Sequence, residues 1–154
     1  MNHRMAHRML DRLLDMLQGG GRGSAPTTEE PHLAVAVLLV EAGLMHGDFS
    51  ADERAMTAHL LSRRFAISAD EAGELIGRAE ARARSSAQYF PFTNSLNTNM
   101  SIDDKIEVIE MLWRIAYADG NLDAFEDQLI RQVAGLLHVP DRDRMNARRR
   151  VLGD

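Results

Sequence analysis

Four oxygen-bearing side chains gather in one short stretch of this sequence. They fall within eight residues, directly after an apolar segment: Asp119, Asn121, Asp123 and Glu126. Carboxylate and amide oxygens are the ligands that hard cations such as Ca²⁺ and Mg²⁺ prefer. The alternating spacing resembles the start of an EF-hand loop, but Gly120 stands at the second position instead of the sixth, and Ile130 replaces the chelating Glu. The stretch therefore predicts a divalent-cation site of another type, for Ca²⁺ or Mg²⁺ rather than Zn²⁺.

The acidic stretch occurs twice in the chain. The segment from His46 to Glu53 recurs 73 residues later as Asp119 to Glu126, and the apolar residues on both sides recur with it. Each copy has the pattern of an apolar helix, a Gly turn and a second helix, which predicts a pseudo-symmetric helical core. Asp48 and Glu53 are the candidate metal ligands in the first copy.

The same residues also have a purely structural interpretation. Ser50 with Glu53, and Asp123 with Glu126, have the spacing of a capping box, in which side chains satisfy free amides at a helix start. Each cap would contribute about 0.5–2 kcal/mol without any ligand, and spacing alone favours this interpretation. Asp119 is explained less well, because a carboxylate near the negative end of a helix is unfavourable unless something neutralises it. Asp119 is therefore the best single candidate for a ligand.

A second unusual charge is Glu41, which lies in an otherwise apolar helix. Because buried charges are usually paired, we expect a salt bridge from Glu41 to an Arg such as Arg114, its equivalent in the other copy. A ligand or acid–base role is the alternative.

Composition and patterning limit the class of protein. The chain has 154 residues, 45% hydrophobic and 5% aromatic, which suits one core-forming domain built from helices. The net charge of -5 argues against a nucleic-acid partner. The chain has no Cys, its longest apolar stretch is too short to span a bilayer, and no signal peptide is recognisable, so we expect a cytoplasmic protein.

The expected fold class is all-α, with about seven helices in a pseudo-two-fold duplicated helical-hairpin bundle. Residues 1–25 are expected to form an amphipathic helix, over 2–17, and a Gly-rich linker, and residues 26–154 the helical domain. Helical periodicity, capping boxes, Gly and Pro place the elements of that domain at 27–46, 50–64, 68–86, 101–118, 123–137 and from 140 onward, with a loop and a short helix over 88–100.

No nucleophile motif, phosphate loop or dinucleotide fingerprint is present, so we expect neither an enzyme nor an organic cofactor. The helix over 2–17 is expected to dock on its own core or on a partner. Protein partners are expected, with a homodimer as one option. Peripheral membrane association through residues 1–17 is an alternative use of the same helix.

The residues around the second turn resemble those of the TerB family of tellurite-resistance proteins, whose superfamily includes the N-terminal domain of the DjlA co-chaperone. The resemblance rests on Leu112 to Gly120, on the tail Leu136 to Pro140 and on the repeated Gly-to-Glu pattern, and covers about residues 30–152. It implies an all-helical pseudo-two-fold fold, a metal-binding role for Asp119, Glu126 and Glu53, and a link to tellurite or chemical-stress responses. The sequence departs from the family at His46, where an Asp is usual, and Asp48 is the nearby substitute.

Two hypotheses follow. In the first, a TerB-like module binds a divalent cation at its acidic turns and serves stress-linked assemblies. In the second, a metal-free interaction domain uses the N-terminal helix and a helix face, and the acidic turns are only caps. An enzyme that handles sulfur or tellurium is disfavoured, because the chain has no Cys as soft ligand or reductant.

Overall fold

The computed structural model describes residues 30–44, 49–85, 90–118 and 124–153. These residues form seven helices and no strand, which confirms the all-α class. The helices are α3 (Pro31–Leu44), α4 (Ala51–Phe65), α5 (Ala69–Ser85), α6 (Phe90–Asn99), α7 (Ile102–Ala116), α8 (Ala124–Leu136) and α9 (Asp141–Leu152). The predicted N-terminal helix and the predicted domain division after residue 25 lie outside the described residues.

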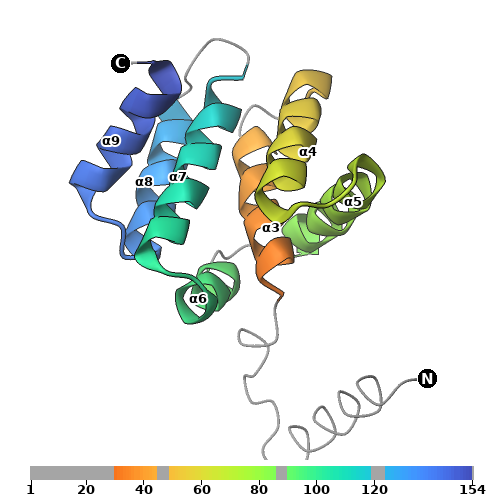
Figure 1. Ribbon diagram of the computed structural model, residues 1–154, viewed down its shortest axis with the longest axis horizontal. Helices are drawn as coiled ribbons and strands as arrows, with labels where there is room; N and C mark the ends of the chain where they lie inside the picture. Colours follow the sequence, from red (N-terminus) through yellow and green to blue (C-terminus); the bar gives the residue numbers. More distant parts are fainter. Residues whose placement is uncertain (1–29, 45–48, 86–89, 119–123, 154) are drawn as a thin grey trace, which may run out of the picture.

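The seven helices form two groups that meet along α3 and α7 (Figure 1). On one side α4 and α5 pack on α3, and on the other side α8 and α9 pack on α7, while α6 contacts α3 and α8. The helices α4 and α8 begin at Ala51 and Ala124, which are 73 residues apart as in the sequence repeat. The pseudo-two-fold relation between the groups stays a prediction.

Helix α3 lies at the centre, because its apolar residues face every direction. Ten of its fourteen residues are buried, from Leu33 through Val40 and then Ala42 and Gly43. A helix that is hydrophobic all round can only be accommodated inside a domain. No helix in the described ranges has the length and apolar character to cross a membrane.

Local signals set the helix ends largely as the sequence predicts. Ser50 caps α4 and Ser101 caps α7, each accepting a hydrogen bond from the amide three residues on. Ser68 and Glu71 exchange both bonds of a capping box at the start of α5, at 2.8 and 3.0 Å. Pro91 stands in the first turn of α6, where a missing amide hydrogen is tolerated. The short helix predicted within residues 88–100 therefore starts at Phe90 and ends at Asn99.

Substitution by alanine at two helical glycines should change the free energy of unfolding in opposite directions. A Cβ on Gly43 would lie 2.5 Å from ring carbons of Phe49, whereas nothing lies within 4 Å of a Cβ on Gly77. Gly77→Ala should raise the free energy of unfolding by about 0.5–1 kcal/mol, because alanine loses less backbone freedom on folding. Gly43→Ala should lower it by about 1 kcal/mol, because overpacking exceeds that gain. Urea unfolding checks both, and equal stabilisation by the two variants would contradict the packing at Phe49.

Candidate functional site

The structure describes two of the six predicted metal ligands, Glu53 and Glu126. The other four, Asp48, Asp119, Asn121 and Asp123, lie outside the described residues. Each described glutamate is the third residue of its helix, Glu53 in α4 and Glu126 in α8. Both are buried, with 2% and 0% of their surface exposed. Two buried carboxylates thus occupy the same position in the first turn of their helices.

Glu53 closes the capping box that the sequence predicts. The Ser50 amide donates to Glu53 Oε1 at 2.9 Å, and the Glu53 amide donates to Ser50 Oγ at 3.1 Å. The Thr57 hydroxyl donates to the Glu53 carbonyl oxygen at 2.7 Å and ties the next turn to the cap. Since an ionised carboxylate has about four acceptor sites, the bond from the Ser50 amide does not by itself exclude a ligand role for Glu53. The capping role and a ligand role are therefore compatible.

The start of α4 lies beside the residues that follow α7. A pocket of about 370 Å³ is lined by Asp52, Ala55, Met56 and His59 of α4 and by Ala118, the residue before Asp119. The exposed carboxylate of Asp52 is the acid that sequence reasoning missed, although it lies directly beside Glu53. The pocket brings the first turn of α4 next to the entry of the second acidic turn.

The metal-ligating side chains among the described residues do not complete a site by themselves. Within residues 30–44, 49–85, 90–118 and 124–153, no three His, Asp or Glu side chains are grouped so that they could hold a metal ion. A cation at this end of the bundle would therefore need oxygens from the acidic turns themselves. The residues of the right type are Asp48 in the first turn and Asp119, Asn121 and Asp123 in the second.

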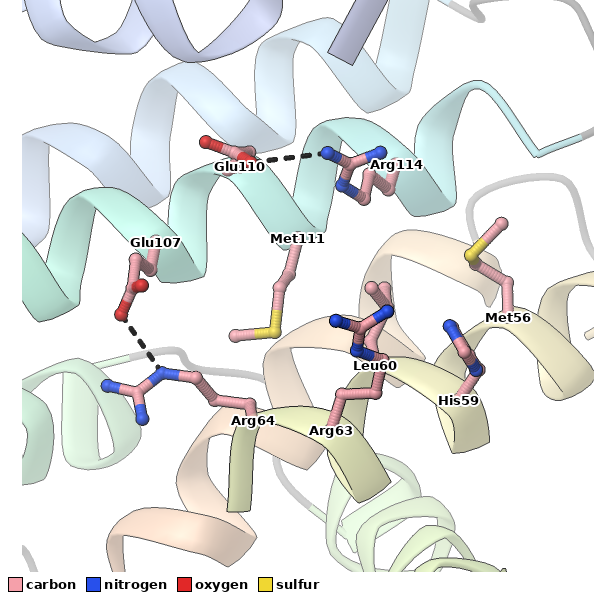
Figure 2. A pocket seen from close by; sticks show the side chains of 9 residues that line it. All are labelled: Met56, His59, Leu60, Arg63, Arg64, Glu107, Glu110, Met111 and Arg114. Atoms are coloured by element: carbon pink, nitrogen blue, oxygen red, sulfur yellow. Dashed lines mark hydrogen bonds and ion pairs between the residues drawn. The ribbon is translucent and has the colours of Figure 1, made fainter. Parts of the chain in front are cut away.

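A second concave surface runs between α4 and α7 (Figure 2). This groove has a volume of about 540 Å³. Its lining residues are Met56, His59, Leu60, Arg63 and Arg64 from α4 and Glu107, Glu110, Met111 and Arg114 from α7. In Figure 2 the side chain of Met111 points from α7 toward α4, and the charged groups lie around it. Neither copy of the repeat predicts this groove, because it forms where the two helix groups meet.

The acids that line the groove are already engaged. Glu107 pairs with Arg64 at 3.1 Å, and Glu110 pairs with Arg114 at 3.3 Å and with Arg150 of α9 at 2.8 Å. Arg63 has no ion pair with any residue that the structure describes. The uncompensated charge of the groove is therefore positive, in a chain whose net charge is -5.

The predicted salt bridge between Glu41 and Arg114 is absent from the described part of the chain. Arg114 pairs instead with Glu110, which lies one turn before it on the same helix. An i,i+4 neighbour is held within reach by the helix itself, whereas a partner on another helix depends on how the helices pack. Partial burial raises the pKa of the Glu41 carboxyl above its ordinary value.

A family model described as "Tellurite resistance protein TerB" matches residues 32–149. Neither a curated protein nor a solved structure is significantly similar to the chain. The matched segment contains both acidic turns and all the described helices except the first residue of α3 and the last three of α9.

Proposed function

The chain belongs to the TerB family, described by the words tellurite resistance, and on that premise we propose that it is a non-catalytic, cytoplasmic, stress-associated module that binds a divalent cation at its acidic turns. The ligands would come from Asp119, Asn121, Asp123 and Glu126 of the second turn, with Asp48 and Glu53 of the first. Ca²⁺ or Mg²⁺ fits these oxygen ligands better than Zn²⁺.

One observation carries this proposal. The pocket that joins Asp52 to Ala118 brings the helix after the first acidic turn next to the residue that leads into the second. Carboxylates from both copies can therefore approach one ion. Glu53 and Glu126 are buried at the third positions of α4 and α8, directly after the two acidic turns, which makes them further candidate ligands. A bound cation would also neutralise acids placed at the negative ends of α3 and α7.

Calorimetry on the metal-stripped full chain tests the proposal. Ca²⁺, Mg²⁺, Mn²⁺ and Zn²⁺ are titrated in turn, and we expect binding at about micromolar concentration for a hard cation. Asp119→Asn should weaken binding by about tenfold or more, because the amide has no negative charge. Asp70→Asn is the matched control, since Asp70 is an exposed acid in the first turn of α5. The absence of heat with every ion, or equal weakening in the control, would contradict a site at the acidic turns.

The complete capping box at Ser50 and Glu53 favours a second function. Because Glu53 Oε1 is already bonded to the Ser50 amide, the first turn has a structural use that needs no ion. In that case the chain is a metal-free protein–protein interaction domain, and the groove between α4 and α7 is its candidate surface. Calorimetry separates the two functions, because the second predicts no heat with any cation.

A further inference from the structure

The groove between α4 and α7 contains a basic side chain without an ionic partner among the described residues. Arg63 is exposed, and no ion pair joins it to any residue within the described ranges. Figure 2 shows its side chain reaching from α4 toward α7. Leu60 lies one turn before it on the same helix face. The groove therefore presents a cationic group directly beside apolar surface, and a guanidinium is a planar fork of donors that matches a carboxylate.

The acids of the groove do not neutralise Arg63, because other arginines already hold them. Glu107 pairs with Arg64 at 3.1 Å. Glu110 pairs through Oε1 with Arg114 at 3.3 Å and through Oε2 with an arginine of α9 at 2.8 Å. Outside the lining, that arginine of α9 and an aspartate of α7 on Arg64 cancel each other in charge. The lining itself has three arginines against two glutamates, so one positive charge is left for an incoming acid.

The apolar part of the groove consists of long, adaptable side chains. Met56 and Leu60, one turn apart on α4, are partly exposed, and Met111 points toward them from α7. The unbranched, polarisable side chain of methionine fits apolar partners of different shapes. Arg and Met are both enriched where proteins bind one another. An occupant of the groove should therefore combine an acid with apolar side chains.

The shape and charge of the groove favour a peptide segment over other anions. Every described residue that lines it belongs to α4 or α7, so the groove has two walls and leaves one side of an occupant open to water. A small molecule is usually bound with most of its surface buried, whereas a helical peptide needs contact along only one face. A nucleic acid would bring many phosphates to a chain of net charge -5 and close to two glutamates of the groove.

We propose that the groove between α4 and α7 binds an acidic peptide segment of a partner protein. An Asp or Glu of that segment pairs with Arg63, and apolar side chains one turn away on the segment pack on Met56, Leu60 and Met111. The inference rests on the interaction function given above as the second candidate, and it adds the chemistry of the partner. The binding needs no cation, so titration of the acidic turns with metal ions does not decide it.

Selection from a library of random peptides displayed on phage, with the full chain as bait, tests this proposal. We expect the enriched sequences to place an Asp or Glu three or four positions from apolar residues, which is the spacing of one helix face. The most enriched peptide, made synthetically, should shift the amide signals of α4 and α7 along the groove. Enrichment of peptides without acids, or shifts confined to other helices, would overturn this proposal but leave the interaction function standing. The absence of any enriched peptide would overturn both.

Charge reversal tests the ion pair with Arg63. Arg63→Glu should raise the Kd of the selected peptide about tenfold, measured by fluorescence anisotropy, because an attraction becomes a repulsion. Replacing the acid of the peptide by lysine should restore much of the affinity for this variant. Arg142→Glu is the matched control, because Arg142 is an exposed arginine on α9 outside the groove. Circular dichroism confirms that each variant is folded. Equal effects of the two chain variants, or no recovery with the lysine peptide, would overturn the pairing at Arg63.

Discussion

Trp113→Ala is expected to lower the free energy of unfolding by about 3–5 kcal/mol, which is the largest effect we predict for a single substitution. Trp113 lies on α7 and is fully buried. Its indole Nε1 donates to the Arg144 carbonyl oxygen of α9 at 3.0 Å, and Arg148 of α9 lies 5.8 Å from its ring centroid. The substitution removes the packing, the hydrogen bond and the cation–π contact that hold α9 on α7.

Urea unfolding followed by far-ultraviolet circular dichroism measures this loss. Trp113→Phe keeps most of the ring and removes the indole donor, so it should lose a smaller part, about 1–2 kcal/mol. Ile102→Ala is a control, because Ile102 is an exposed apolar residue of the same helix. A loss for Trp113→Ala no larger than that for Ile102→Ala would contradict the packing of α9 against α7 described above.

Glu53→Ala is expected to have the second-largest effect, a loss of about 2 kcal/mol. The substitution leaves the Ser50 amide without its acceptor and opens space at a position that is 2% exposed. Glu71→Ala is the matched control, because Glu71 closes the same motif with Ser68 at an exposed site. We expect a clearly smaller loss there, since water can satisfy the freed amide.

The contribution of the Glu71 cap to the free energy of unfolding should depend on pH. Hydrogen bonds from the backbone and hydroxyl of Ser68 lower the pKa of the Glu71 carboxyl below its ordinary value. A lowered pKa means that this stabilisation is present above the pKa of the unfolded chain and is lost as the pH falls through the pKa of the folded one. The stability difference between wild type and Glu71→Ala should therefore shrink in acid. Equal losses for Glu53→Ala and Glu71→Ala at neutral pH would contradict the burial of Glu53.

The helices were predictable where local chemistry decides them. The Ser–Glu pairs at residues 50 and 53 and at residues 68 and 71 both form capping boxes, because such a box involves only four consecutive residues. Helix α3 is central because its own sequence is apolar all round. Both features depend on near neighbours in the chain, so periodicity and spacing are sufficient to find them.

The contacts between distant helices were not predictable in the same way. The equivalence of Glu41 and Arg114 in the repeat predicts a salt bridge, but the structure pairs Arg114 with Glu110. The groove with Arg63 also depends on how α4 packs beside α7, and no local pattern fixes that arrangement. Asp52 was missed for the same reason, since its interest comes from lying near Ala118. Sequence spacing indicates which residues share a helix face but not which faces meet.

Titration of the metal-stripped, isotope-labelled chain with Mn²⁺, followed by nuclear magnetic resonance, tests the central claim most directly. A single cation site that uses both acidic turns predicts early loss of the amide signals of Asp52, Ala118 and Glu126 together. The signals of Asp70 and Glu74, exposed acids on α5, should persist at the same Mn²⁺ concentration. Equal broadening of the α5 signals, or broadening beside only one of the two turns, would contradict a shared cation site.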